Sequence, residues 1–344
     1  MSKKRTKKTD EYRLQHNTFF EETFMMPEFG AAFLKKTLPR KLKKRLDIDK
    51  LTVEKTKFRD KLFRETRPDV VYKVPIIGAE GHISFHVIIE HKSSDDHSAI
   101  YQIWQYVGQL CIQDVNKRLT DPETKKPTAW PKDFRLSPII PIILHHGDKP
   151  FTGETQLVNL FYPLPGAEEF LPHLQAILVD LSAMEEGKLP RDRNAPELFV
   201  VLLMMKVIFS KDKKTLKNRF NEILDELQPY SQMPKYRELI RKLWYYVMYN
   251  AENMTETDFT EMENKVRKTI GDDDMPTMAQ IFINKGEVKS KVESILSFLE
   301  GRFGEVPQPI RDAVGQISDL AVLRQLTVLA AKCKTLNEFA KAVK

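Results

Sequence analysis

The sequence predicts an α/β domain followed by a helical extension. Within the first 150 residues, helical and strand-like patterns follow one another in the order helix, strand, strand, helix, strand. After Gly147 the patterns are helical, apart from one short strand-like stretch at 176–179. A chain of 344 residues can hold one medium domain with a substantial extension, or two domains.

The first predicted element is a helix over 16–38. Four phenylalanines recur at helix-compatible spacing: Phe20, Phe24, Phe29 and Phe33. Pro27 lies inside this pattern, so the helix is expected to kink or break there, and Pro39 ends it.

A β-hairpin is predicted next. The stretches 70–77 and 83–89 are rich in Val, Ile, Tyr and Phe, and Gly78 and Gly81 bracket a four-residue turn between them. A turn that pairs Gly78 with Gly81 would place Asp69 opposite Glu90. Residues paired across antiparallel strands lie about 5 Å apart and point to the same face, and Lys92 joins that face two residues later.

An amphipathic helix over 98–115 and a polar loop over 120–135 are predicted after the hairpin. The nearly continuous apolar run at 138–145 then has the length of a strand that is buried on both faces.

The rest of the chain is predicted to be helical. The helices are expected at 195–210, 214–227, 235–250 and 257–270, and in a tail over 278–344. We therefore expect a basic tail at 1–15, an α/β domain at 16–190, a helical extension at 191–270 and a small helical region at 271–344, with a hinge at 271–274.

The composition indicates a cytoplasmic protein with no membrane segment. Cys111 and Cys333 are far apart, so neither a disulfide framework nor a zinc site is suggested. The N-terminus lacks the apolar core of a secretory signal. The longest apolar run, 198–209, is too short to span a bilayer of about 30 Å and is read as a buried helix.

Basic residues are gathered in two places, and the net charge is +7. One cluster lies within 3–8 and the other within 35–45, where Lys41, Lys43 and Lys44 are the candidate phosphate-binding residues. The alternative, left open, is a solvated tail and a solvated helix face.

Asp69, Glu90 and Lys92 are the candidate catalytic residues. Two adjacent carboxylates repel each other but can share Mg²⁺, which prefers carboxylate and water oxygens. Lys92 could orient or deprotonate an attacking water, or stabilise charge developing on a phosphate. On spacing alone the alternative, three ordinary strand-end residues, is equally acceptable.

This segment resembles the PD-(D/E)XK nuclease signature, and its context resembles the Rpn family of recombination-promoting nucleases, also called putative transposases. The matching pieces are, in order along the chain: His16 with Phe20 and Phe24; Arg67, Asp69, Val70 and Tyr72; Ile89, Glu90, His91, Lys92, Ser93 and Ser94; Tyr106; Pro141; His146 and Gly147.

The resemblance implies an αβββαβ core with a mixed sheet, of which the residue patterns predict all but one strand before Ser98. It also implies DNA cleavage with Mg²⁺, or with Mn²⁺ or Ca²⁺, and a link to recombination. Two departures are visible: many members carry Gln where this chain has Lys92, and Asp where it has Asn17. The end of the chain is similar to the helical tail of such proteins.

Five further residues are accessory candidates. Gln102, Gln105 and Tyr106 lie on the helix after the signature, where relatives in the wider superfamily place a Gln or Tyr. Glu21 or Glu22 on the first helix could add a metal contact. For each, an ordinary surface role is the alternative. His146 is expected to serve a capping or turn role.

These observations predict a metal-dependent DNA endonuclease associated with recombination or transposition. The alternatives are a non-catalytic DNA-binding or transposition accessory protein and a nuclease that acts on RNA. The C-terminal helices could also join copies of the chain through an apolar stripe.

Overall fold

The computed structural model describes residues 19–343 except for 55–57, 60–64, 67–69, 79–83, 93–96, 125, 252–253, 272–277, 316 and 318. The side chains of 58–59, 65–66, 84–92 and 278–285 also lie outside this description. The chain divides into two compact units, a sheet unit over His16–Asn253 and a C-terminal unit from Met254 onward. Each unit is described by itself.

The sheet unit contains strands, α-helices and short 3-10 helices. The strands are β1 Thr52–Glu54, β2 Phe58–Arg59, β3 Glu65–Thr66, β4 Val70–Pro75, β5 Ser84–Lys92, β6 Ile139–His145 and β7 Ile177–Asp180. The α-helices are α2 Pro27–Thr37, α3 Arg40–Lys43, α4 Ala99–Arg118, α5 Pro196–Val207, α6 Lys213–Leu227 and α7 Pro234–Asn250. The 3-10 helices are η1 Ile48–Lys50, η2 Leu157–Leu160, η3 Glu168–Phe170, η4 Glu186–Lys188 and η5 Gln228–Tyr230.

The main sheet is mixed, with strand order β1-β4-β5-β6-β7. The first two pairings are antiparallel and the last two are parallel, with α4 as the crossover between β5 and β6. The elements up to β6 therefore run helix, three sheet strands, helix, strand. Within this five-stranded sheet, the strand that the residue patterns did not predict is β1. Its three residues are too few to show an alternating pattern.

The hairpin register is the one predicted. Val70 pairs with Ile89 and Pro75 with Ser84, as a turn around Gly78 and Gly81 requires. Gly78 has a φ of 75°, which suits a residue without a side chain. Asp69 lies outside the described residues, so its own pairing stays a prediction.

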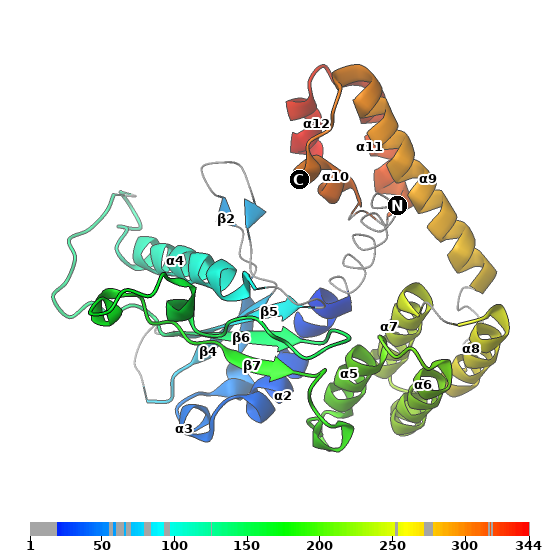
Figure 1. Ribbon diagram of the computed structural model, residues 1–344, viewed down its shortest axis with the longest axis horizontal. Coiled ribbons are helices and arrows are strands. Elements are labelled where there is room, and N and C mark those ends of the chain that lie inside the picture. Colours follow the sequence, from blue (N-terminus) through cyan, green and yellow to red (C-terminus); the bar gives the residue numbers. More distant parts are fainter. Residues whose placement is uncertain are drawn as a thin grey trace. The chain divides into compact units, whose positions relative to one another are not determined.

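Two helices cover opposite faces of the sheet, as Figure 1 shows for α2 and α4. On the α2 face, the buried hydroxyl of Tyr72 donates a hydrogen bond of 2.5 Å to the carbonyl of Phe24. On the α4 face, Val71 packs with Tyr106 and Leu110 in one buried cluster. Neighbouring residues of β4 thus point to different helices, as the pleat of a strand demands.

The predicted break of the first helix is confirmed at Pro27. Residues 19–24 are helical, and α2 begins at Pro27, where a proline is tolerated because the first turn leaves its N–H groups unbonded. The phenylalanines of the two segments are buried together: Phe20 stacks on Phe24 with ring centroids 4.2 Å apart, and Phe24 meets Phe29 edge-on at 4.7 Å.

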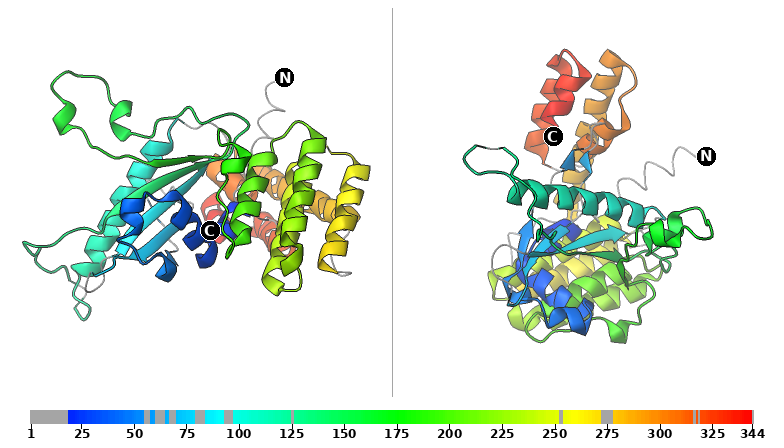
Figure 2. Two further views of the ribbon diagram at one scale, coloured as in Figure 1. Left: turned by 90° about the horizontal axis from the view of Figure 1, so that it is seen from below. Right: turned by 90° about the vertical axis from the view of Figure 1, so that its left-hand side faces the viewer.

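Helices α5, α6 and α7 complete the sheet unit and lie side by side (Figure 2). The predicted buried helix is confirmed, because almost every residue of α5 is buried. The carboxylate of Glu197, 1% exposed, accepts hydrogen bonds from Lys235 at 2.5 Å and from Tyr236 at 3.0 Å. Helix α5 contacts α2 as well as α6 and α7. The boundary between the predicted α/β domain at 16–190 and the predicted helical extension at 191–270 stays a prediction.

The described elements of the C-terminal unit are all helices. Its helices are α8 Glu256–Ile270, α9 Met278–Phe303, α10 Gln308–Gly315, α11 Leu320–Lys332 and α12 Leu336–Ala342. One apolar cluster packs the four helices α9, α10, α11 and α12 together and includes Leu299, Leu323 and Phe339. Arg302 donates to the carbonyls of Ala330 and Cys333, both at 2.7 Å, and so satisfies the C-terminal end of α11.

No helix in the described part of the chain is long and apolar enough to cross a membrane.

Candidate active site

Two of the three predicted catalytic residues, Glu90 and Lys92, belong by their backbones to a strand in the middle of the sheet. Glu90 and Lys92 belong to the C-terminal end of β5, the central strand. Their backbones pair in parallel with Ile143 and His145 of β6. Asp69 would immediately precede β4, which begins at Val70, but it lies outside the described residues, as do the side chains of Glu90 and Lys92.

The sheet positions around this strand end are covered by the first turn of α4. Ile143, which pairs with Glu90, is fully buried in a cluster with Ala99 and Ile100. Residues paired between parallel strands occupy the same face of the pleat. Position 90 of β5 is therefore in register with a residue of β6 that packs against the start of α4.

His145 is a buried titratable residue beside this strand end. It is 1% exposed, its Nε2 lies 2.8 Å from the carbonyl of Lys149, and its ring packs against Phe151 with centroids 5.4 Å apart. The contact with a carbonyl requires the proton on Nε2. The remaining nitrogen, Nδ1, is buried and has no hydrogen-bond partner in the described part of the protein.

Asp180 joins the end of β7 to the segment after β6, and Lys206 of α5 holds the residues that follow β7. The sequence patterns singled out neither residue. Asp180 accepts hydrogen bonds from the backbone N–H of Phe151 at 2.8 Å and of Ser182 at 2.9 Å. The ammonium of Lys206 donates to the carbonyl of Leu181 at 2.7 Å. An Asp directly after an apolar strand was the available signal for the first of these. Lys206 lies within an apolar helical run, and nothing local indicated its partner.

The accessory candidates on α4 have different surroundings. Tyr106 is 7% exposed and packs on Val71 of β4. Gln102 donates to the hydroxyl of Ser98 at 2.8 Å, and Gln105 donates to the hydroxyl of Tyr101 at 3.3 Å. Tyr106 thus lies between α4 and the sheet, whereas Gln105 is on the exposed side of the helix.

The candidates on the first helix, and His146, have structural contacts. Glu22 forms an ion pair with Lys242 of α7 at 3.0 Å, which provides its charge with a partner without any metal. Glu21 is half-buried. The Nδ1 of buried His146 lies 3.2 Å from the carbonyl of Met205 in the last turn of α5, in agreement with a capping role.

Within the described residues, no group of three or more His, Cys, Asp or Glu side chains could hold a metal ion. A site built on Asp69 and Glu90 therefore rests on backbone register and on the chemistry of the two carboxylates.

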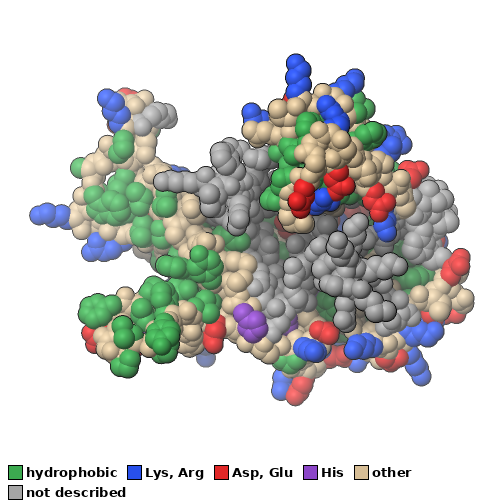
Figure 3. All heavy atoms as spheres, turned by 45° about the horizontal axis from the view of Figure 1, so that its top comes forward, with side chains coloured by type: hydrophobic (Ala, Val, Ile, Leu, Met, Phe, Trp, Pro, Cys, Tyr) green, Lys and Arg blue, Asp and Glu red, His purple; other side chains and the backbone are tan. Residues whose placement is uncertain are grey.

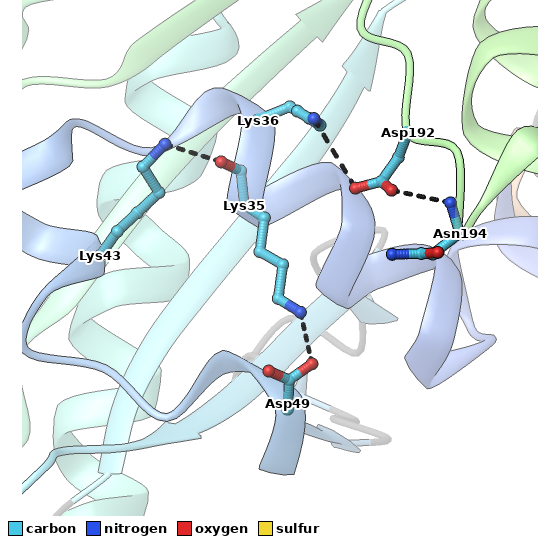
Figure 4. Close-up of polar contacts among 6 residues, drawn as sticks. All are labelled: Lys35, Lys36, Lys43, Asp49, Asp192 and Asn194. Atoms are coloured by element: carbon cyan, nitrogen blue, oxygen red, sulfur yellow. Dashed lines mark hydrogen bonds and ion pairs between the residues drawn. The ribbon is translucent and has the colours of Figure 1, made fainter.

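Three lysines of the basic segment 35–45 have polar partners within the described residues (Figure 4). Lys35 pairs with Asp49, Lys36 lies 3.7 Å from Asp192, and Lys43 donates to the carbonyl of Lys35 at 2.7 Å. Lys41 and Lys44 are exposed, and neither has an acidic partner among the residues the structure describes. Of the three lysines predicted to bind phosphate, Lys43 thus also caps a backbone carbonyl.

We expect the double substitution Lys41→Ala and Lys44→Ala to weaken DNA binding without unfolding the protein. Each lost phosphate contact should reduce the slope of log K against log salt by about 0.9. Binding is measured by fluorescence anisotropy in EDTA over a range of salt concentrations. The matched control is Lys289→Ala with Lys332→Ala, two exposed lysines of the C-terminal unit. Equal slopes for the two double variants would assign Lys41 and Lys44 to an ordinary solvated face.

Comparison with known families decides where this chain belongs. Residues 14–234 match the family described as putative transposase, YhgA-like, and this match covers the whole candidate site and more than half of the chain. The chain belongs to this family.

Relatives of this YhgA-like protein include named nucleases. It is 26% identical to the recombination-promoting nuclease RpnD of Escherichia coli O157:H7 over 254 residues, which cover 65% of this chain and 90% of the relative. It is 23% identical to the recombination-promoting nuclease RpnC of Escherichia coli K12 over 212 residues, covering 61% of this chain and 64% of that protein. The resemblance to the Rpn family is therefore confirmed.

The YhgA-like family also includes relatives that are named inactive. The inactive recombination-promoting nuclease-like protein RpnE of Escherichia coli K12 is 21% identical over 210 residues, covering 61% of this chain and 64% of the relative. No solved structure matches the chain significantly. Family membership alone thus leaves open whether this member cleaves nucleic acid.

Proposed function

We propose that this protein is a divalent-metal-dependent DNA endonuclease with a PD-(D/E)XK core and with Asp69, Glu90 and Lys92 as its catalytic residues. The observation that carries the proposal is the β4–β5 register, which pairs Val70 with Ile89. If the same register continues by one residue, Asp69 comes opposite Glu90. Two carboxylates so placed are a suitable pair of ligands for a hard cation.

The residues of the chain divide the work in this proposal. Asp69 and Glu90 would hold Mg²⁺, which when bound supplies a Lewis acid for the phosphoryl oxygen and favours ionisation of water. Lys92 contributes a cation near the scissile phosphate, where it stabilises developing negative charge and orients the attacking water. The element order helix, three strands, helix, strand and the names of the nuclease relatives support the same reading.

The basic surface of Lys41 and Lys44 is proposed to hold the DNA backbone. Both lysines are exposed and lack acidic partners among the described residues, so they can neutralise phosphates and release the counterions condensed on the DNA. The second candidate function is a non-catalytic DNA-binding or transposition accessory protein. It is favoured by the occurrence of relatives that are named inactive.

An assay with purified protein separates these functions. Supercoiled plasmid and a structured RNA are each incubated with Mg²⁺, Mn²⁺, Ca²⁺ or EDTA. We expect plasmid cleavage with Mg²⁺ or Mn²⁺ and none with EDTA. Cleavage of RNA alone would identify a ribonuclease. A folded protein that binds DNA but cuts neither substrate under any metal would identify the accessory protein.

A further inference from the structure

The outer side of α4 is an exposed stripe that contains none of the three candidate catalytic residues. It consists of Tyr101, Trp104, Gln105, Gly108 and Ile112, spaced by three or four residues on the side opposite the buried residues Ile103, Tyr106 and Leu110. Tyr101 is 46%, Trp104 39% and Ile112 54% exposed. Tyr101 and Trp104 meet edge-on with ring centroids 6.1 Å apart.

The α4 stripe continues onto the segment between β6 and β7. Trp104 contacts Phe161 with centroids 6.4 Å apart. Beyond this contact, large apolar side chains are exposed on the same segment: Leu160, Tyr162, Leu164 and Phe170. Figure 3 shows hydrophobic side chains gathered on the side of the molecule that carries α4 and this segment. A continuous apolar surface of this kind marks an interaction site.

The charges around the stripe argue against nucleic acid as its occupant. Residues 99–113 contain no charged residue, and 150–187 contain no Lys or Arg, although 30% of the chain is charged. The exposed apolar segment carries acidic residues instead, Glu154, Glu168 and Glu169. Binding to DNA depends on cations that neutralise phosphates, and this surface lacks them.

The charges do favour a second copy of the chain. The acidic residues accompany the segment that meets the N-terminal half of α4, whereas residues 117–135 beyond its C-terminal end carry six Lys or Arg against three Asp or Glu. If two α4 helices pair antiparallel, the acidic end of each copy meets the basic end of the other. The uncharged stripe then forms the centre, where charge would be costly to bury.

Gly108 lies at the midpoint of the 20-residue helix, on the exposed stripe. A Cβ added there would have no atom within 4 Å, so the helix backbone is open to close approach. A two-fold axis at Gly108 would place Trp104 opposite Ile112 of the partner subunit, an aromatic ring against an aliphatic side chain. It would likewise place Tyr101 opposite Val115 of the partner subunit. Such an arrangement is self-complementary, as a two-fold interface requires.

We propose that the protein forms a two-fold dimer through antiparallel pairing of α4, centred on Gly108. This interface differs from the one expected from the sequence, which used the C-terminal helices. It also stands independently of the proposed catalytic activity.

Sedimentation velocity of the full chain over a range of concentrations tests the dimer. We expect the wild type to dimerise and Ile112→Arg to raise the dimer dissociation constant by at least about 100-fold, because a cation would be buried against an apolar partner. Gln113→Arg is the matched control, exposed on the same helix but about 140° away from Gly108, and should not change dimerisation. Val328→Arg, at an exposed position of α11, tests the C-terminal route and should also have no effect.

Crosslinking at the axis provides a second measurement that does not depend on a destabilising charge. With Cys111 and Cys333 both replaced by Ser, Gly108→Cys should form a disulfide-linked dimer on mild oxidation, and Gln113→Cys should not. A disulfide requires Cα atoms about 4.4 to 6.8 Å apart, which only residues near the axis satisfy. A wild-type protein that stays monomeric overturns the proposal. So does a dimer that survives Ile112→Arg, or one that is lost only with Val328→Arg.

Discussion

Replacing Glu90 with alanine is expected to reduce metal-dependent DNA cleavage by about 10³-fold or more, and Asp69→Ala should do the same. Removal of one member of an interdependent catalytic set commonly costs that much. Folding should persist in both variants, because removing one of two repelling carboxylates relieves their repulsion in the metal-free protein. Rates are measured on supercoiled plasmid in Mg²⁺, with circular dichroism to monitor folding.

Three comparisons sharpen this test. Glu90→Gln keeps the shape of the side chain and removes only its charge, so it should lose activity as fully as Glu90→Ala. Glu123→Gln removes an exposed carboxylate of the loop after α4 and should retain wild-type activity. Lys92→Ala should impair cleavage, whereas Lys92→Gln should keep part of it, given the glutamine in many relatives. Binding to DNA in EDTA should survive throughout. Wild-type cleavage by Asp69→Ala or Glu90→Ala would show that the active site lies elsewhere.

The largest expected effect on stability comes from Gly30→Ala. In an open helix this change stabilises by up to about 1 kcal/mol. A Cβ on Gly30, however, would lie 2.5 Å from Cζ of the Tyr72 ring and 2.6 Å from its hydroxyl oxygen. The ring is fully buried and its hydroxyl is bonded to the carbonyl of Phe24, so it cannot move aside freely. We expect the free energy of unfolding to fall by about 3 kcal/mol in urea denaturation.

The controls for Gly30→Ala separate a steric clash from a general effect of replacing glycine. Gly187→Ala adds the same methyl group in η4, where no atom lies within 4 Å, and should change stability by less than about 0.5 kcal/mol. In the double variant Gly30→Ala with Tyr72→Leu, the smaller side chain leaves room for the methyl. Its destabilisation should therefore be less than the sum of the two single effects. Strict additivity would mean that the close approach of Gly30 to Tyr72 is not what limits stability.

Much of the fold could be predicted because its signals are local. Pro27 marks the break in the first helix, and the glycines around the turn determine the pairing of Val70 with Ile89. The continuous apolar run of α5 predicted its burial. Strand β1 escaped prediction because it has only three residues, of which Thr52 and Glu54 are polar. It pairs antiparallel with β4, and Glu54 of β1 forms an ion pair with Lys73 of β4.

The candidate site was less predictable than the fold. The order of Asp69, Glu90 and Lys92 along the chain could be read directly, since a hairpin brings nearby residues together. His145 and Lys206 could not be found that way, because their partners are backbone carbonyls, which residue patterns do not distinguish from one another. The ion pair of Glu22 with Lys242 is likewise invisible in sequence, since it joins helices more than two hundred residues apart. Local patterns therefore identify reacting groups better than they identify the contacts that orient them.

The mixed sheet also has a consequence for how the chain folds as it is synthesised. The antiparallel half, β1, β4 and β5, lies within residues 52–92 and can pair as soon as Lys92 has emerged from the ribosome. The parallel half has to wait, because β6 reaches β5 only after α4 and the following loop have been made. Until then β5, the strand that carries Glu90 and Lys92, is an unprotected sheet edge, which other chains can extend. Rapid docking of α4 and β6 should therefore limit aggregation of the nascent protein.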